Sequence, residues 1–204
     1  MKRKVKLKSP FYILVLTIVP VLLVTAMLNV NQKEKQNEDQ EKEVIVDSYP
    51  VINDNDKIIN PYSNDSVKIG KSYYDYKAEE KNQEDSLIVH DDTYYQNTGI
   101  DFVSDETFDV LSISGGTVIS VKEDEAVGKT IEIKHDNGLI SIYQSLSEIA
   151  VKKNDVVSQG QVIGKSGNNE LDKELGNHVH LELYENGQSV NPELYLGKKY
   201  EKKN

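Results

Sequence analysis

The sequence predicts an all-β domain that follows one N-terminal transmembrane helix and a polar stalk. Three observations lead to this fold class. One long uncharged apolar run lies within the first 30 residues, the next 13 residues contain no apolar side chain, and the chain after residue 94 is dense in short apolar alternations separated by turn residues. Alternation with a period of two is typical of strands, and no long stretch with the helical period follows the apolar run. Short strands joined by tight turns favour antiparallel pairing.

The apolar run extends from Phe11 to Val30. At 1.5 Å per residue it is about 30 Å long, which is enough to cross the hydrocarbon core of a bilayer. Five basic residues and no acidic residue precede it, which predicts that residues 1–10 stay in the cytoplasm and that the rest of the chain lies outside. A cleaved signal peptide is the alternative, but its apolar region is usually shorter, and residues 25–29 form a poor cleavage site. We therefore expect an uncleaved anchor over residues 11–30.

The stretch between the anchor and the β domain is predicted to have two parts. Residues 31–60 are expected to be a stalk or linker, because residues 31–43 have no apolar side chain and cannot bury a core. Residues 61–94 are expected to flank the β domain. Within this flank, the pattern indicates a charged loop over residues 78–85 and a hairpin inside residues 71–92.

Composition excludes several kinds of site. The chain has no Cys, which rules out a disulfide framework, a thiolate zinc site and a Cys nucleophile. Its formal net charge is -10, and all 34 acidic residues follow the basic N-terminal segment. Nucleic-acid binding needs basic side chains that neutralise phosphates, so this acidic body argues against it. The Lys-rich tail at residues 197–204 is most simply a solvated end.

The β domain is expected over residues 95–196. Asp136-Asn137-Gly138 predicts a tight hairpin turn, because Asn-Gly tolerates the positive φ of such turns. Residues 145–149 are expected to form a single helical turn.

The segment from Gly176 to Tyr184 alternates polar and apolar residues, the pattern of a half-buried strand. Because side chains on a strand repeat every two residues, His178, His180 and Glu182 share one face. Two imidazoles on one face of a strand can bind a metal, transfer a proton, or do both.

Seven short motifs carry a resemblance to a known family. They are Asn97-Thr98-Gly99-Ile100-Asp101, Ser114-Gly115-Gly116-Thr117-Val118, Ile131-Glu132-Ile133-Lys134-His135-Asp136-Asn137-Gly138, Tyr143-Gln144-Ser145-Leu146, Gly160-Gln161-Val162-Ile163-Gly164, Gly176-Asn177-His178-Val179-His180-Leu181-Glu182 and Val190-Asn191-Pro192. In this order and spacing, residues 95–196 resemble the LytM (lysostaphin-type) zinc endopeptidase domain. Three features are most similar to a branch of this family that acts in sporulation. They are the sequence of residues 143–147, the preceding Tyr94-Tyr95 pair and the single anchor.

The resemblance implies a zinc site, because active members bind zinc through the His and Asp of H-x-G-x-D and the second His of H-x-H. Asp101 and His180 stand in the last two of these places, but Asn97 stands in the first. A neutral amide oxygen is a much weaker zinc ligand than imidazole. We therefore expect Asp101 and His180 to be remnant metal ligands with weak or partial zinc binding, and we expect no cofactor.

The resemblance also implies a catalytic pair of histidines. In active members, a His in the Tyr-x-His-Leu segment and the first His of H-x-H stabilise the transition state. Ser145 stands at the first of these places and leaves His178 without its partner. A hydroxyl cannot become cationic to offset a developing oxyanion. We therefore expect Ser145 and His178 to be vestigial and the protein not to be an enzyme.

The histidines also have simpler interpretations. His178 and His180 would then be half-exposed strand residues that hydrogen bonds hold in place. His90 lies seven residues before Asn97 and is a candidate substitute ligand, but it is more simply a loop residue. His135 precedes a predicted turn and is most simply part of it.

The resemblance to the sporulation branch implies a non-enzymatic role. Such a protein is a single-pass membrane protein of the forespore, with its C-terminal domain in the intermembrane space. It pairs with a mother-cell membrane protein of the stage III sporulation protein AH type and supports engulfment and a channel between the two cells. Strand addition at an exposed sheet edge is one physical means of pairing. A homo-oligomeric ring stays open, as do two alternative functions: a zinc-dependent peptidoglycan endopeptidase and a peptidoglycan-binding module.

Overall fold

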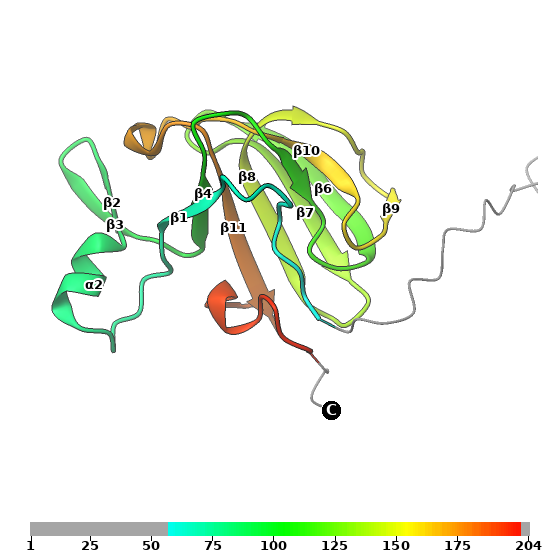
Figure 1. Ribbon diagram of the computed structural model, residues 1–204, viewed down its shortest axis with the longest axis horizontal. Coiled ribbons are helices and arrows are strands. Elements are labelled where there is room, and N and C mark those ends of the chain that lie inside the picture. The colour runs from blue at the N-terminus through cyan, green and yellow to red at the C-terminus, as the bar shows by residue number, and fades with distance from the viewer. Residues whose placement is uncertain (1–56, 201–204) are drawn as a thin grey trace, which may run out of the picture. The chain divides into compact units, whose positions relative to one another are not determined.

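The computed structural model of the protein describes residues 57–200, in which ten strands form one antiparallel sheet and two more form a separate hairpin (Figure 1). Seven strands follow the order β1-β4-β11-β8-β7-β6-β9, while β12 pairs with β11, and β10 pairs with both β5 and β8. The elements are β1 (Lys68–Lys71), α2 (Glu80–Asp85), β2 (Leu87–His90), β3 (Thr93–Gln96), β4 (Ile100–Val103), β5 (Asp109–Leu111), β6 (Gly116–Asp124), β7 (Gly128–His135), β8 (Ile140–Ile149), β9 (Val156–Val157), β10 (Val162–Ser166), η1 (Lys173–Leu175), β11 (His178–Glu185), β12 (Gln188–Val190) and η2 (Pro192–Leu194). The predicted antiparallel β domain is therefore confirmed.

The predicted anchor over residues 11–30 and most of the predicted stalk lie outside the described residues. From residue 57 to residue 200, no helix combines the length and the apolar character needed to cross a bilayer.

The hydrophobic core is built on the long strands β6, β7, β8 and β11. Ile131 and Ile133 of β7, Tyr143 of β8 and Leu181 of β11 are completely buried. The Ile113 amide donates a hydrogen bond to the Tyr143 hydroxyl at 2.9 Å, and burial raises the pKa of Tyr143 to about 12. The buried Tyr143 hydroxyl thus has a hydrogen-bond partner, as buried polar groups generally do.

The β7–β8 hairpin confirms one predicted turn and corrects a neighbouring prediction. Its turn consists of residues 136–138, with Gly138 at φ 91°. The helical turn predicted over residues 145–149 is wrong, because this segment continues β8. Ser145 has φ 64°, since Gln144 and Ser145 together stand opposite Thr130 and form a bulge.

The flank that precedes the family-like region also differs from its prediction. Six residues of the predicted charged loop form α2, and the hairpin lies at residues 87–96 rather than inside residues 71–92. Its two-residue turn is formed by Asp91 and Asp92, with φ 48° and 59°. Asp tolerates this left-handed conformation better than most residues, which explains a turn without glycine. In Figure 1, α2, β2 and β3 lie to one side of the large sheet.

The two ends of the described chain are paired with each other. Residues 57–58 bridge to residues 196–199, an arrangement that we call the clasp. The Ile58 amide donates to the Lys198 carbonyl at 3.0 Å, the Gly197 amide donates to the Ile58 carbonyl at 2.7 Å, and the Ile58 side chain is 1% exposed. The folded domain therefore begins inside the predicted stalk and extends into the predicted tail.

Candidate functional site

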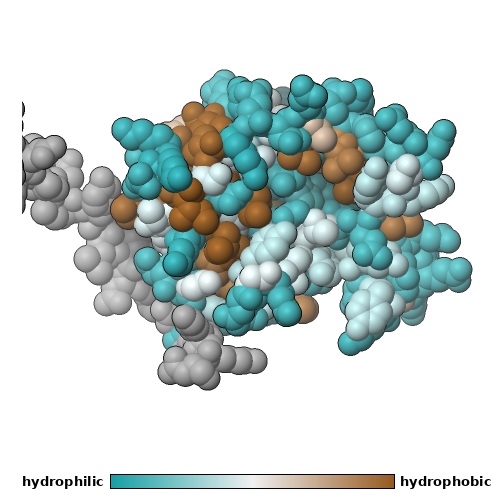
Figure 2. Space-filling view, turned by 180° about the vertical axis from the view of Figure 1, so that it is seen from behind, coloured by the Kyte–Doolittle hydropathy of each residue, from teal (hydrophilic) through white to brown (hydrophobic). Residues whose placement is uncertain are grey.

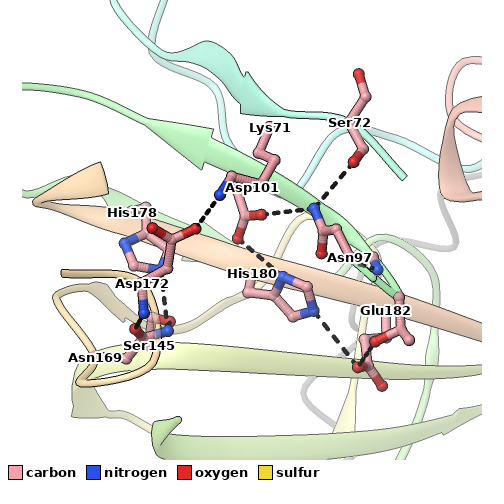
Figure 3. Close-up of polar contacts among 12 residues, drawn as sticks. Lys71, Ser72, Asn97, Asp101, Ser145, Asn169, Asp172, His178, His180 and Glu182 are labelled. Atoms are coloured by element: carbon pink, nitrogen blue, oxygen red, sulfur yellow. Dashed lines mark hydrogen bonds and ion pairs between the residues drawn. The ribbon is translucent and has the colours of Figure 1, made fainter. Parts of the chain in front are cut away.

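The candidate site lies where β11 passes between β4 and β8. Register places His180 of β11 opposite Asp101 of β4, and His178 lies two residues earlier on the same strand (Figure 3). Six consecutive residues of β11, from His178 to Leu183, are buried. The prediction of a half-buried strand is therefore wrong, because neighbouring segments cover the histidine face as well.

His180 is held between two carboxylates. Its Nδ1 lies 2.8 Å from Asp101 Oδ1, and its Nε2 lies 3.5 Å from Glu182 Oε1. Burial alone would lower the pKa of His180, but the charges and hydrogen bonds of Asp101 and Glu182 outweigh it and raise the pKa to about 10. His180 and Asp101, which stand at the two predicted ligand positions, are thus bonded to each other.

Glu182 completes this cluster. Its carboxylate accepts hydrogen bonds from the Thr98 hydroxyl at 2.6 Å and from the Tyr184 hydroxyl at 3.0 Å. Burial alone would raise the pKa of Glu182, but hydrogen bonds from His180, Thr98 and Tyr184 lower it overall. Sequence reasoning placed Glu182 on the histidine face but gave it no role, because these partners come from the loop before β4 and from its own strand.

Asn97 faces the same cluster as a hydrogen-bond donor. Its side-chain nitrogen donates to Asp101 Oδ2 at 2.9 Å and to the Ser72 carbonyl at 3.0 Å. The Asn97 oxygen accepts from the Gly99 amide at 3.4 Å. A Cβ at Gly99 would lie 2.8 Å from the His180 ring, so this loop can approach the strand only with glycine. At the first ligand position, the amide therefore directs its NH₂ group toward the carboxylate.

The two positions predicted to be vestigial, Ser145 and His178, are brought together by a third residue. Asn169 donates to the Ser145 hydroxyl at 2.8 Å and lies 3.3 Å from His178 Nε2. His178 Nδ1 lies 2.8 Å from the Gly176 carbonyl, which fixes Nδ1 as the protonated nitrogen and leaves Nε2 as an acceptor. Ser145 and His178 are thus neighbours, but Asn169 uses the lone pair with which the imidazole could act as a base.

The last residue of β1 and the residue after it cover the site, and we call these two residues, Lys71 and Ser72, the strap. The Lys71 ammonium forms an ion pair with Asp172, and only 11% and 8% of the two side chains are exposed (Figure 3). Lys71 also donates to the Leu87 carbonyl at 2.9 Å. Sequence reasoning missed the strap because a lone Lys between Gly70 and Ser72 carries no motif.

The covered residues are nearly inaccessible to solvent. The fractional exposures are Asn97 1%, Asp101 2%, Ser145 0%, His178 0% and His180 6%. Within residues 57–200, no group of three or more His, Cys, Asp or Glu side chains is arranged to hold a metal ion.

The remaining two described histidines lie apart from this network. His90 ends β2, where its Nε2 is 3.5 Å from Asp91, and it makes no bond to the site residues. His135 ends β7 and is buried, and its carbonyl accepts a hydrogen bond from the Gly138 amide at 2.9 Å, so it opens the turn as predicted. Its Nδ1 is 3.1 Å from the Gly115 carbonyl and its Nε2 is 2.7 Å from the Ser141 hydroxyl.

Comparison with known proteins agrees with the predicted resemblance. Residues 95–192 match the model of peptidase family M23. Stage II sporulation protein Q of Bacillus subtilis is 38% identical over 136 residues, which cover 66% of this chain and 48% of that protein. The peptidoglycan DD-endopeptidase ShyA of Vibrio cholerae is 36% identical over 95 residues, which cover 47% of this chain and 22% of that protein. The chain therefore spans about half, or less, of the length of these curated relatives.

Solved structures give the same result. One chain of the SpoIIQ–SpoIIIAH pore-forming complex aligns with TM-score 0.66 and 36% identity, covering 69% of this chain and 90% of that chain. The catalytic domain of lysostaphin from Staphylococcus simulans aligns with TM-score 0.51 and 23% identity, covering 65% of this chain and 93% of that chain. At that identity, the lysostaphin match supports the fold alone.

Proposed function

We propose that this chain, which belongs to peptidase family M23, is a membrane-anchored sporulation protein that binds a partner protein and does not hydrolyse peptide bonds. The observation that carries the proposal is the alignment with SpoIIQ. It extends over 90% of a chain taken from a complex with SpoIIIAH. The proposed partner is accordingly a SpoIIIAH-like membrane protein, met across the space between forespore and mother cell. A role in engulfment and in a channel between the two cells belongs to the same proposal.

The donor set supports the non-hydrolytic part of the proposal. A catalytic zinc needs three protein ligands and one open position for water. Here Asn97 offers an N–H donor to one oxygen of Asp101, and the other Asp101 oxygen lies 2.8 Å from Nδ1 of His180. The first ligand position thus presents protons where a lone pair is needed, so these residues do not fit a catalytic zinc ion, which needs three donor atoms with free lone pairs.

The covering segment supports it further. A peptidase must admit both a peptide strand and water to the reacting atoms. The strap places the Ser72 carbonyl 3.0 Å from Asn97, and the Lys71–Asp172 ion pair lies beside the vestigial histidine (Figure 3). A substrate would have to displace a buried ion pair, which costs several kcal/mol.

Two measurements on the full-length protein in detergent test this proposal. The first combines zinc quantification with release of muropeptides from purified cell wall, with ShyA as the active control. We expect substoichiometric zinc and no release. Release that depends on bound zinc would overturn the non-hydrolytic role and favour the endopeptidase alternative.

The second measurement is binding to the extracytoplasmic domain of a SpoIIIAH-like protein from the same organism. We expect a stoichiometric complex that survives gel filtration. Failure to bind this domain, together with sedimentation of the protein with cell wall, would favour the peptidoglycan-binding alternative.

A further inference from the structure

We propose that the domain docks on the surface of an anionic phospholipid bilayer through exposed valines and lysines at the β9 end of its large sheet. This inference rests on the proposed function, because the predicted anchor would hold the domain close to such a bilayer. Three features support it: exposed apolar side chains, lysines without carboxylate partners, and a position where the described chain begins. We call this surface the valine–lysine face, and its members are Lys57, Lys152, Lys153, Val156, Val162 and Lys198.

The first feature is exposed apolar surface. Val156 of β9 is 79% exposed, and Val162 of β10 is 41% exposed. β9 is the last strand in the seven-strand order, so no further strand covers its outer side within residues 57–200. In Figure 2, brown surface gathers in the left half of the view, which is the side on which β9 lies. Exposed apolar side chains that gather in this way mark a contact with a protein or a membrane.

The second feature is a set of lysines that no carboxylate neutralises. Lys57, Lys152, Lys153 and Lys198 are exposed, and none of them takes part in an ion pair within residues 57–200. Lys152 and Lys153 lie in the turn just before Val156. The Asp155 carboxylate closes this turn by accepting a hydrogen bond from the Lys152 amide at 2.9 Å. Ammonium groups held in this way are free to contact lipid phosphates.

Charge is distributed unevenly over the domain. Residues 148–165 and 198–199 together contain five lysines and two acidic residues, whereas residues 72–96 contain two lysines and seven acidic residues. Figure 1 shows α2, β2 and β3, which belong to the acidic segment, on the opposite side of the large sheet from β9. An anionic surface therefore attracts one end of the domain and repels the other, which orients the domain as it approaches.

Contacts between distant segments bring the members of the valine–lysine face together. The Gln159 side chain donates to the Lys57 carbonyl at 2.7 Å. A Cβ at Gly160 would lie 3.8 Å from the Ile59 side chain, so the turn between β9 and β10 packs beside the first described residues. The clasp adds Lys198 to the same group, because its carbonyl accepts the hydrogen bond from Ile58.

The third feature is the place of this face in the chain. Lys57 is the first described residue, and the 26 residues from 31 to 56 separate it from the predicted anchor. Even when fully extended, these residues reach at most about 90 Å, so an anchored domain stays near the bilayer. A tethered surface meets its target at a high effective concentration, and a few weak contacts are then enough for docking.

A bilayer surface fits both kinds of side chain. Valines can enter the boundary between headgroups and acyl chains while the neighbouring lysines contact phosphates. A dissolved anionic polymer would engage the lysines alone and leave the valines in water. Docking through the valine–lysine face would direct β1, at the other end of the sheet, away from the bilayer and toward the space in which the proposed partner lies.

The test uses the full-length protein in lipid nanodiscs, with one copy per disc, and exploits the absence of tryptophan from the chain. Val156→Trp places a single fluorophore on the valine–lysine face, and Val89→Trp, at a position of β2 that is 53% exposed, is the matched control. The discs contain phosphatidylglycerol with brominated acyl chains, which quench tryptophan on contact. Relative to discs without bromine, we expect at least about a twofold loss of emission for Val156→Trp and less than about 10% for Val89→Trp.

A second set of variants tests the role of charge. Lys152→Gln/Lys153→Gln, added to Val156→Trp, should remove at least about half of the quenching, as should neutral phosphatidylcholine discs or salt at about 0.5 M. Lys68→Gln/Lys81→Gln removes the same charge from β1 and α2 and should leave the quenching within about 10% of its original value. Quenching that depends on neither the lysines nor the anionic lipid would overturn recognition of an anionic surface.

Hydrogen exchange of the wild-type protein removes any influence of the introduced ring. Slower exchange of residues 152–162 in phosphatidylglycerol discs than in phosphatidylcholine discs supports docking, and equal exchange overturns it. Equal emission from Val156→Trp and Val89→Trp would also overturn docking and leave the anchor intact. A change in Val156→Trp emission that appears only with two copies per disc would assign the face to a second copy of this chain instead. If the full-length protein does not co-elute with the discs, the anchor of the proposed function fails first.

Discussion

At the scale of single residues, Asn97 determines what the site can hold. Its NH₂ group is occupied by the Asp101 carboxylate and the Ser72 carbonyl. An imidazole at this position would offer a lone pair where the amide offers protons. The Asn97 side chain therefore presents N–H donors where a zinc ligand would present a lone pair. Its amide oxygen is also a weaker zinc ligand than imidazole.

This argument predicts the effect of Asn97→His. We expect the variant to bind zinc at least about tenfold more tightly than wild type, because three protein ligands replace two. It should still release no muropeptides, since Ser145 cannot supply a cationic group. Zinc titration by calorimetry checks the first expectation, with Asn168→His, at an exposed position, as the matched control. Equal zinc affinity in the two variants would contradict it.

His135 is a second residue whose surroundings set its chemistry. Burial lowers the pKa of its imidazole, despite opposing contributions from hydrogen bonds at Gly115 and Ser114. The unfolded chain therefore takes up a proton at a higher pH than the folded chain does. Its contribution to stability is complete above the ordinary histidine pKa of about 6.5 and is lost as pH falls through the lower folded pKa.

The corresponding prediction compares His135→Gln with wild type. At pH 7 the variant should lose about 1–3 kcal/mol of unfolding free energy, because the hydrogen bonds to Gly115 and Ser141 are disturbed. The difference between the two proteins should shrink as pH falls below about 6.5. Urea unfolding at pH 7, 6 and 5 measures it, with His90→Gln as the control for loss of an imidazole. A difference that stays constant with pH would show that His135 does not titrate as argued.

At the scale of elements, the strap connects β1 to the loop before η1. The Lys71–Asp172 ion pair is buried. Lys71 also donates to the Leu87 carbonyl, and the Asp172 amide donates to the Asn169 side chain. Removing one member of such a pair leaves the other charge buried without compensation. The strap should therefore stabilise the fold while it covers the candidate site.

Replacing Lys71 tests this role of the strap. We expect Lys71→Met to cost about 3–5 kcal/mol of unfolding free energy, and Lys71→Met/Asp172→Leu to recover part of the loss. Lys68→Met, an exposed position on the same strand, should change stability by less than about 0.5 kcal/mol. Denaturant unfolding of the three variants gives the comparison. Equal losses for Lys68→Met and Lys71→Met would rule out a buried pair.

At the scale of the whole molecule, the sequence predicted the antiparallel β domain and located the residues of its site. Alternation predicted that His178, His180 and Glu182 share one face. The family-like motifs predicted that Asp101 and Asn97 belong to the same site, and the structure places Asp101 opposite His180 and beside Asn97. What could not be predicted depended on contacts between segments far apart in the chain. Lys71 lies 101 positions from Asp172, and the burial of the histidine face follows from that cover.

Two of the wrong local predictions have different physical causes. Residues 145–149 join β8 because neighbouring strands supply their hydrogen bonds, which overrides local preference. The six residues of α2 bury no side chain, so no apolar periodicity could reveal them.

The clasp is the feature through which both ends of the described chain support the fold. We expect Ile58→Ala to cost about 2–5 kcal/mol, because it empties a buried position of the hydrophobic core. Leu194→Ala, at a position that is 63% exposed, should cost less than about 1 kcal/mol. Thermal unfolding followed by circular dichroism distinguishes the two. A melting temperature lowered equally in both variants would argue against the clasp.

The clasp also determines how the domain would bear mechanical force. Tension applied to the chain ahead of residue 57 reaches the two backbone hydrogen bonds of Ile58 before it reaches any strand of the large sheet. These bonds join the beginning of the fold to its end, so pulling at the beginning loads both termini together. The first event under load would be the separation of residues 57–58 from residues 196–199, with the β-sheet still intact.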